Sequence, residues 1–405
     1  MEKLKDREFD FGSKLRQEST MESLKRYISW RRTVGGEAVD PEPPDFAPVS
    51  INLDLTSACN FSCPHCVDSK IINTGELLRL DDVKHTIDVL RSHGLLSVIL
   101  LGGGEPTLHR NFEEIVRYIK NRGLELGIVT NGSRLEKVIR ITELLGEKDW
   151  IRISIDAARE DTFYSLHRPK NHVTLKHILN KARVIKEVNS LVSLGYSFVI
   201  VWEGIEMNGK RLAPNTGEIA DAVSLAREYS FDFVSFKPFL MRLEDSQKEG
   251  LLDNVDKRAE EGIIEDIRFN LQKGKRVLDG EVKVLESVNL RAMMNQEIKE
   301  IKRQPKRCHM QFFRTVVSPS GIFHCPAFRG VEKAKIAESD GYASEHKFEE
   351  TLKTLARSIA TFDAEEECKV VACFYHHVNW WLANFIHSGR DISALEQLKD
   401  DNFFL

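Results

Sequence analysis

Apolar and polar positions in the first half of the chain follow two alternating periods. The run Ile-Asn-Leu-Asp-Leu-Thr at 51–56 is apolar at every second position, which is typical of a half-buried strand. Residues 97–101 are continuously apolar, as in a parallel strand that is buried on both faces. Between them, residues 80–92 repeat apolar side chains at helical spacing, and Gly94 ends that helix. The pattern predicts strands joined by helices.

The same alternation continues to about residue 240. Further strands are expected at 126–130, 150–156, 196–202 and 231–237. Further helices are expected at 111–122, 134–145, 173–189 and 216–229. Asn111 and Glu114 have capping-box spacing at the start of the first of these helices. Six strands with helical crossovers predict an α/β fold, a partial (β/α)6 TIM-like barrel that is open on one side. Ligands of such sheets gather at the carboxyl ends of the strands.

This pattern divides the chain into four segments. Residues 1–48 are expected to form a charged N-terminal extension, and residues 49–243 the barrel. Residues 244–304 are rich in charge and helical in period, so we expect a helical linker. Residues 305–405 contain four cysteines of their own and are expected to form a distinct C-terminal domain.

Composition narrows the possible functions. The 405 residues are 41% hydrophobic and 30% charged, so the chain can bury a large core. The net charge of −4 gives no global attraction to nucleic acid or anionic lipid. Apolar runs are too short to span a membrane, and the first 14 residues are too charged for a secretion signal. We therefore expect a cytoplasmic protein with neither nucleic acid nor a membrane as a partner.

Three of the seven cysteines lie on one short loop. Cys59, Cys63 and Cys66 have the spacing C-x3-C-x2-C and directly follow the first predicted strand. Three thiolates on one loop can ligate three irons of a [4Fe–4S] cluster and leave the fourth iron open. A zinc knuckle or unrelated surface thiols are the alternatives. Zinc usually takes paired C-x2-C units and a closed fourth position, and His65 lies inside the same tight loop.

The cysteine triplet resembles the signature of the radical S-adenosylmethionine (radical SAM) superfamily, C-x3-C-xΦ-C, with His65 at the usually aromatic position Φ. The resemblance implies that the open iron binds the amino and carboxylate groups of S-adenosylmethionine. It also implies that one electron from the reduced cluster breaks a sulfur–carbon bond of that cofactor. The resulting 5′-deoxyadenosyl radical would abstract a hydrogen atom from the substrate. An electron donor such as a flavodoxin or a ferredoxin is implied as a partner.

A glycine-rich turn, Gly-Gly-Gly-Glu-Pro at 102–106, follows the second strand at the same end of the barrel. A phosphate loop is disfavoured because no Gly-Lys-Ser/Thr follows. The turn resembles the GGEP motif of the radical SAM family, in which glycine carbonyls and the glutamate accept hydrogen bonds from the ammonium group of the cofactor. The resemblance assigns this role to Gly103, Gly104 and Glu105.

The fourth strand carries polar residues on one face, namely Arg152, Ser154 and Asp156. They resemble the S-x-D element with which the family binds ribose, and Arg152 could pair with a carboxylate. A polar layer that lines the barrel is the alternative. Asn131 lies on the same rim, where it is either a turn residue or a cofactor contact.

The other four cysteines lie in the last quarter of the chain. Cys308 and Cys325 flank a hairpin turn at 318–321, and Cys368 and Cys373 follow later. Four thiolates complete one closed site, which suits structural zinc as well as an iron–sulfur cluster. The order of spacings resembles the twitch form of the SPASM auxiliary-cluster domain, which implies a second [4Fe–4S] cluster. Two departures are the final C-x4-C in place of C-x2-C and the three residues between Gly321 and Cys325 in place of four.

These features lead to three hypotheses of function. The first is a radical SAM oxidoreductase that oxidises a small molecule by two electrons through the auxiliary cluster, with Lys237, Tyr196 or Glu203 as candidate bases. The second is a radical SAM enzyme that modifies a peptide or a protein. The third is a zinc-binding interaction module on a degenerate barrel. If all seven cysteines are ligands, no thiol remains to donate a hydrogen atom, which disfavours epimerase-type chemistry.

Overall fold

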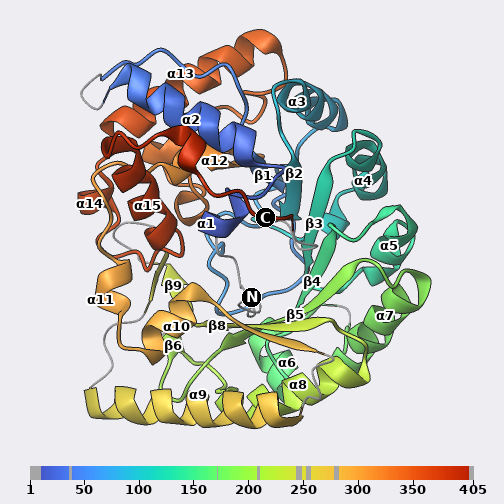
Figure 1. Ribbon diagram of the computed structural model, residues 1–405. Helices are drawn as coiled ribbons and strands as arrows, with labels where there is room; N and C mark the ends of the chain where they lie inside the picture. Colours follow the sequence, from blue (N-terminus) through green and yellow to red (C-terminus); the bar gives the residue numbers. More distant parts are fainter. Residues whose placement is uncertain are drawn as a thin grey trace.

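The computed structural model describes residues 11–35, 39–170, 172–207, 210–242, 249–251, 257–277 and 282–400. Its main feature is a ten-stranded sheet in the order β11-β8-β5-β4-β3-β2-β1-β12-β13-β14 (Figure 1). Its strands are β1 (Ser50–Asp54), β2 (Ser97–Leu101), β3 (Glu125–Thr130), β4 (Trp150–Ser154), β5 (Ser193–Ile200), β8 (Phe233–Pro238), β11 (Lys283–Glu286), β12 (Arg314–Ser318), β13 (Gly321–Phe323) and β14 (Lys335–Ala337). The predicted α/β fold is confirmed.

The six predicted barrel strands β1, β2, β3, β4, β5 and β8 lie side by side in chain order and pair in parallel. Helices cover the outer face of this sheet (Figure 1). They are α3 (Leu80–Ser92), α4 (Phe112–Asn121), α5 (Leu135–Ile139), α7 (Leu175–Val188) and α8 (Ile219–Glu228). Helix α6 (Glu160–His167) instead packs against Phe61 of the loop that follows β1. The short helix α6 was not predicted.

Alternating apolar side chains explain why these helices pack on the sheet. In α4, Phe112, Ile115, Val116 and Ile119 are buried, while the acidic residues of its first turn are not. The predicted capping box at Asn111 is wrong. Asn111 has φ −99° and ψ 19°, whereas a capping residue has an extended backbone, and its amide donates instead to His109 Nδ1 at 3.2 Å.

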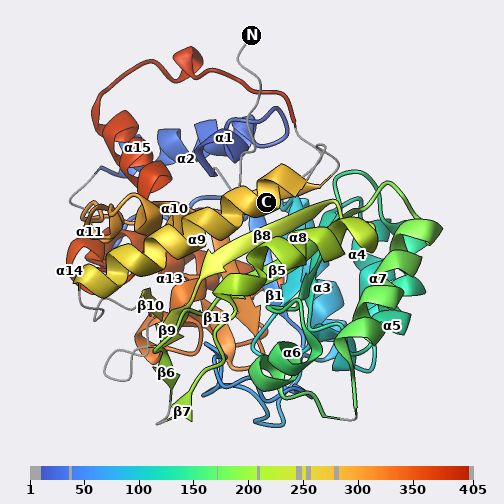
Figure 2. The same ribbon diagram turned by 90° about the horizontal axis from the view of Figure 1, so that it is seen from below.

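The segment predicted as a helical linker is only partly helical. It contains α9 (Lys257–Val277), α10 (Val288–Met294) and α11 (Ile298–Ile301), and α9 runs along α8 (Figure 2). Strand β11 lies between α9 and α10 and extends the sheet beside β8. Two small hairpins complete this region, β6 (Glu206–Met207) with β7 (Lys210–Arg211) and β9 (Leu240–Arg242) with β10 (Glu249–Leu251).

The C-terminal segment continues the barrel sheet. Strand β12 pairs in parallel with β1, and the predicted hairpin turn at 318–321 joins β12 to β13. The remaining helices are α12 (Met310–Phe313), α13 (Glu345–Thr361), α14 (Ala364–Glu367) and α15 (His376–His387). The N-terminal helices α1 (Phe11–Lys14) and α2 (Met21–Val34) pack against α15 (Figures 1 and 2).

The helices within the described ranges include none that is both long and apolar enough to cross a membrane.

Candidate active site

The loop with the first three cysteines follows β1; it is tied to Asn73 at its start and closes on itself in a turn at its end. The amide of Cys59 donates to Asn73 Oδ1 at 2.9 Å, and the amide of Cys66 donates to Cys63 O at 3.2 Å. Phe61 is buried between these cysteines and contacts the rings of Phe163 and His167. The apolar side chain in the middle of the loop therefore fixes it to the barrel.

Burial raises the pKa of all three thiols. The pKa of Cys66 is raised to about 12, first by burial and then by the charge of Asp68. Burial raises the pKa of Cys63 well above its ordinary value, and the neighbouring thiols Cys66 and Cys59 add to this effect. The raised pKa values keep the thiols protonated on their own, whereas a bound metal cation would deprotonate its thiol ligands and offset the repulsion among three thiolates. The donor set therefore fits a metal cluster.

The glycine-rich turn after β2 packs directly on the cysteine loop. A Cβ atom on Gly104 would lie 2.4 Å from Thr56 O and 2.6 Å from Ala58 O, so only glycine fits there. The amide of Glu105 donates to Ala58 O at 2.8 Å. The two sequence motifs, which are about 40 residues apart in the chain, therefore share one surface in the fold.

The buried carboxylate of Glu105 ties neighbouring loops together. It accepts hydrogen bonds from Thr107 Oγ1 at 2.6 Å, Thr130 Oγ1 at 2.7 Å and the amide of Asn131 at 2.7 Å. Asn131 in turn donates to Asn60 Oδ1 of the cysteine loop at 3.0 Å. Glu105 thus connects the turns after β2 and β3, and its contact with an ammonium group stays a prediction.

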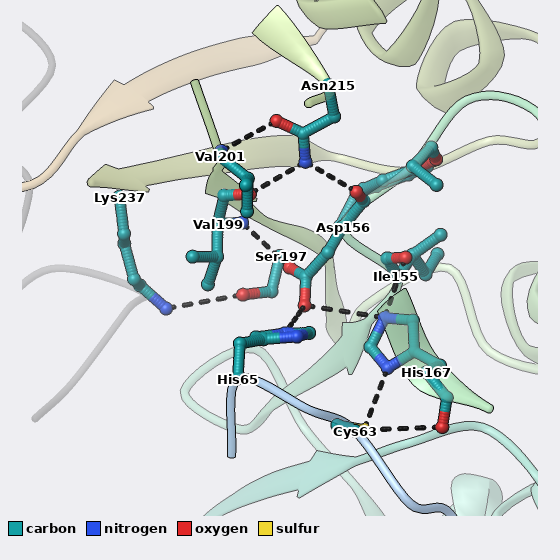
Figure 3. Close-up of polar contacts among 12 residues, drawn as sticks. Cys63, His65, Ile155, Asp156, His167, Ser197, Val199, Val201, Asn215 and Lys237 are labelled. Atoms are coloured by element: carbon teal, nitrogen blue, oxygen red, sulfur yellow. Dashed lines mark hydrogen bonds and ion pairs between the residues drawn. The ribbon is translucent and has the colours of Figure 1, made fainter. Parts of the chain in front are cut away.

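A hydrogen-bonded network joins the cysteine loop to β4 and β5 (Figure 3). Asp156 accepts a bond from the amide of Val199 at 2.7 Å, and its other oxygen lies 3.3 Å from Nε2 of both His65 and His167. His167 Nδ1 lies 3.3 Å from the sulfur of Cys63. Burial alone would raise the pKa of Asp156, but the bonds to the two histidines hold it below its ordinary value.

The position of Asp156 differs from the expected strand alternation. Strand β4 ends at Ser154, and Asp156 has φ 53°, a left-handed conformation. Its carboxylate is consequently directed at the two histidines (Figure 3). Ser154 and Arg152 remain on β4, both half-buried, and Arg152 lies over the ring of Trp150. A ribose contact of Ser154 and Asp156 stays a prediction, as does a carboxylate contact of Arg152.

His65 has one nitrogen in the network and one without a partner. Because Nε2 faces the Asp156 carboxylate, that nitrogen carries the hydrogen, and Nδ1 is a buried acceptor with no hydrogen bond. An unsatisfied acceptor beside the cysteine loop fits a nucleotide cofactor, which can donate to it.

Sequence reasoning missed His167, Arg329 and two aspartates. Arg329 Nε lies 2.8 Å from Asp54 Oδ2, and its Nη1 lies 3.1 Å from Asp68 Oδ2. Asp54 also accepts the amide of Gly103 at 3.2 Å. Burial raises the pKa of Asp54 to about 6, which Arg329 opposes. No short motif contains these residues, since Arg329 is 261 positions from Asp68.

The four C-terminal cysteines line one cavity. Cys325 follows β13, while Cys368 ends α14 and Cys373 precedes α15. Burial raises the pKa of Cys308 to about 11 and that of Cys373 to about 12. His324, the residue before Cys325, is buried in the same lining. Within the described ranges, no three His, Cys, Asp or Glu side chains lie close enough together to hold a single metal ion, and this applies to the triplet at 59–66 as well as to this cavity.

The three candidate bases lie in different surroundings. The hydroxyl of Tyr196 donates to Ala157 O in the core, and Glu203 is exposed beside Arg211. Lys237 extends from the end of β8 toward the network, with Nζ 3.3 Å from Ser197 Oγ (Figure 3). Of the three, Lys237 is the one that faces the site.

Comparison with known proteins adds three findings. Residues 53–207 match the model of the Radical SAM superfamily. An S-adenosylmethionine-dependent nucleotide dehydratase from Selenomonas ruminantium is 34% identical over 157 residues, which are 37% of this chain and 56% of that protein. A mitochondrial GTP 3′,8-cyclase from Arabidopsis thaliana is 31% identical over 198 residues, which are 47% of this chain and 46% of that protein.

Among solved structures, Streptococcus suis SuiB bound to its precursor peptide SuiA has a TM-score of 0.56 at 16% identity. The match covers 82% of this chain and 71% of that chain, and at this identity it concerns the fold. The chain spans about half the length of the two curated relatives named above. The cysteine triplet and the glycine-rich turn lie inside the family match, and the four C-terminal cysteines lie outside it.

Proposed function

Because the barrel of this chain belongs to the radical SAM superfamily, we propose that the site at the end of β1 and β2 performs reductive cleavage of S-adenosylmethionine. When bound, the [4Fe–4S] cluster and S-adenosylmethionine together supply a 5′-deoxyadenosyl radical that abstracts a hydrogen atom from the substrate. The observation that carries the proposal is the direct packing of the glycine-rich turn on the cysteine loop at Gly104.

In this proposal the chain's own residues bind and orient the two groups. Cys59, Cys63 and Cys66 ligate three irons. The backbone of Gly103 and Gly104 faces the amino group of S-adenosylmethionine, and Glu105 fixes that turn by its bonds to Thr107, Thr130 and Asn131. His65 Nδ1, which has no partner, would accept a hydrogen bond from the nucleoside, and Ser154 and Asp156 would contact the ribose.

The C-terminal cysteines would hold a second [4Fe–4S] cluster. Four thiolates around this cavity would ligate all four irons, and such a closed cluster would supply an electron acceptor rather than a binding place for substrate. Loss of a hydrogen atom, a proton and an electron is net two-electron oxidation. Lys237 is the proposed base because it faces the network that joins the cysteine loop to β4 and β5.

Two classes of substrate are proposed, a nucleotide-like small molecule first and a peptide second. The names of the matched relatives, a nucleotide dehydratase and a GTP cyclase, favour a nucleotide-like small molecule. A peptide is the second class, because the fold is similar to that of SuiB, which was solved with a peptide bound. Transfer of deuterium from a labelled candidate into 5′-deoxyadenosine distinguishes the two classes.

Iron, sulfide and zinc analysis of anaerobically reconstituted protein is the first test. About eight irons per chain support both clusters, and about four support one. Zinc without sulfide would support the interaction module instead. With dithionite and S-adenosylmethionine, the protein is expected to release 5′-deoxyadenosine. Cys63→Ala is expected to abolish this release. Cys325→Ala is expected to lower the iron content but to retain the release of 5′-deoxyadenosine. Full release by the Cys63→Ala protein would contradict the proposal.

A further inference from the structure

A basic pocket lies on the face formed by α2, α15 and the loop that precedes Cys308. The two helices lie side by side in both views (Figures 1 and 2). Arg32 joins them, since its guanidinium donates to Phe385 O at 2.9 Å and to Ile386 O at 3.3 Å. The pocket has a volume of about 760 Å³, which is within the range of small-molecule sites. It shares no lining residue with the cavity of the four cysteines.

The charged side chains that line this pocket are all positive among the described residues. Its lining includes four cations, Arg31, Arg32, Lys306 and Arg307. Among the described residues that line it, none is acidic. Cations on a protein surface are ordinarily interspersed with acids, because like charges that gather in one concave place repel each other. The concentration of positive charge therefore favours an anionic ligand.

Two buried side chains in the lining have polar atoms without partners. Arg31 is 5% exposed, and neither its Nε nor its Nη1 has a hydrogen bond. His309 is 1% exposed; its Nδ1 bonds to the hydroxyl of Tyr27 at 2.9 Å, whereas its Nε2 has no partner. Two buried guanidinium nitrogens without an acceptor cost free energy, because they have lost their hydrogen bonds to water and gained none in the protein. An oxyanion in the pocket would satisfy them.

One wall of the pocket is aromatic. Trp380 is 38% exposed, and its indole nitrogen is fixed by a bond to Arg303 O at 2.9 Å. The indole therefore presents a flat apolar surface beside the cations.

From these features we infer that the pocket between α2 and α15 binds a small phosphate-bearing molecule, with Arg31 as its principal anchor. A phosphate offers several oxygens to a planar guanidinium, which it can engage through two parallel hydrogen bonds. The aromatic wall suits a phosphate that carries a ring. This site is independent of the proposed radical chemistry, because its residues are neither thiols nor part of the network around Asp156.

Binding to the full-length protein tests the inference without any turnover. Calorimetry at 150 mM NaCl with inorganic phosphate, pyrophosphate and ATP is expected to show saturable binding. Arg31→Met is expected to weaken it at least about tenfold, since a charge-assisted hydrogen bond is lost. The same variant is expected to have a higher Tm than the wild type in the absence of phosphate, because the unpaired buried charge is gone. Arg26→Met, on α2 but paired with Asp45 outside the pocket, is the matched control and is expected to bind normally.

Comparison of the three titrations also identifies the ligand and can overturn the inference. Tighter binding of ATP than of pyrophosphate assigns a nucleoside phosphate, and equal binding assigns bare phosphate groups. No saturable binding, equal binding by the wild type and Arg31→Met, or binding of polyglutamate in place of all three phosphates would each refute the site.

Discussion

Gly104 is a residue at which the two loops of the candidate site pack too closely for any side chain. A Cβ atom there would overlap the backbone at Thr56 and Ala58, which cannot give way as a flexible side chain would. Gly104→Ala is therefore expected to separate the loops and to lower the rate of 5′-deoxyadenosine release by about 100-fold, the usual cost of a small misplacement. Its iron content is expected to stay normal because the cysteines remain.

Gly262→Ala is the matched control for that substitution. Gly262 lies in α9, and a Cβ atom there would meet no atom within 4 Å. This variant is expected to keep the wild-type rate. A wild-type rate in Gly104→Ala would show that the contact between the loops does not matter for cleavage.

His167 is the residue that links a cysteine of the triplet to the buried acid Asp156. His167 Nε2 faces two acceptors, Ile155 O at 2.8 Å and Asp156 Oδ2 at 3.3 Å, so Nδ1 donates to the sulfur of Cys63 only when both ring nitrogens carry a hydrogen. A cysteine sulfur bound to iron can only accept hydrogen bonds, and such bonds make a cluster easier to reduce. His167→Phe removes the donor at 3.3 Å and keeps an aromatic ring among Phe61 and Phe163. We expect a more negative midpoint potential for the cluster, measured by redox titration monitored by electron paramagnetic resonance. An unchanged potential would refute the link.

Some residues of the site could be predicted from the sequence, and others could not. The cysteine triplet and the glycine-rich turn are short motifs, so their residue types and spacing were sufficient. His167 acts on Cys63 from 104 positions away, and only the packing of α6 brings the two together. The backbone conformation of Asp156 was equally hidden, because a non-glycine residue with positive φ has no clear signature.

At the scale of elements, the periodicity of apolar residues predicted the six barrel strands within a few residues. It failed where elements are short. Helix α6 spans eight residues, in which Phe163 and Leu166 are the buried apolar positions. Strand β11 has four residues with charged ends, Lys283 and Glu286, and its place is set by pairing with β8. Neither segment is long enough to show a period.

The connection from the glycine-rich turn to α4 depends on a neutral histidine. His109 Nδ1 accepts a hydrogen bond from the backbone amide of Asn111, and Nε2 lies 3.0 Å from the acceptor Leu78 O. Both contacts are made when Nε2 alone carries a hydrogen, which is the neutral form of the ring. Burial lowers the pKa of His109 below its ordinary value. The unfolded chain therefore binds the proton first as the pH falls below about 6.5, and the free energy of unfolding decreases.

His109→Gln is expected to flatten this part of the pH dependence. The measurement is urea unfolding at several pH values between 5 and 7.5. His177→Gln, at an exposed position on α7, is the control and is expected to leave the slope unchanged. Identical slopes for wild type and His109→Gln would show that another group is responsible.

At the scale of the whole molecule, the C-terminal segment is joined to the barrel more closely than its sequence suggested. The cysteine spacing indicated a distinct unit, but β12 pairs with β1, and Arg329 reaches Asp54 and Asp68. Pairings over such distances in the chain leave no local pattern, since each partner is an ordinary residue in its own segment. The consequence is that the two cysteine sites share one continuous sheet.

Arg329 makes this connection testable. It is buried with two carboxylates, so Arg329→Met leaves both acids without their cation. Removing one partner of a buried ion pair typically costs about 3–5 kcal/mol, because the remaining charge stays desolvated. We expect a decrease of that order in the free energy of unfolding of reduced, metal-free protein. Adding Asp68→Asn is expected to recover part of the lost free energy of unfolding, because one uncompensated charge is removed.

Arg357→Met, which breaks the exposed pair with Asp40, is the control and is expected to cost less than about 1 kcal/mol. Equal losses for Arg329→Met and Arg357→Met would show that the buried ion pairs do not hold the C-terminal segment on the barrel.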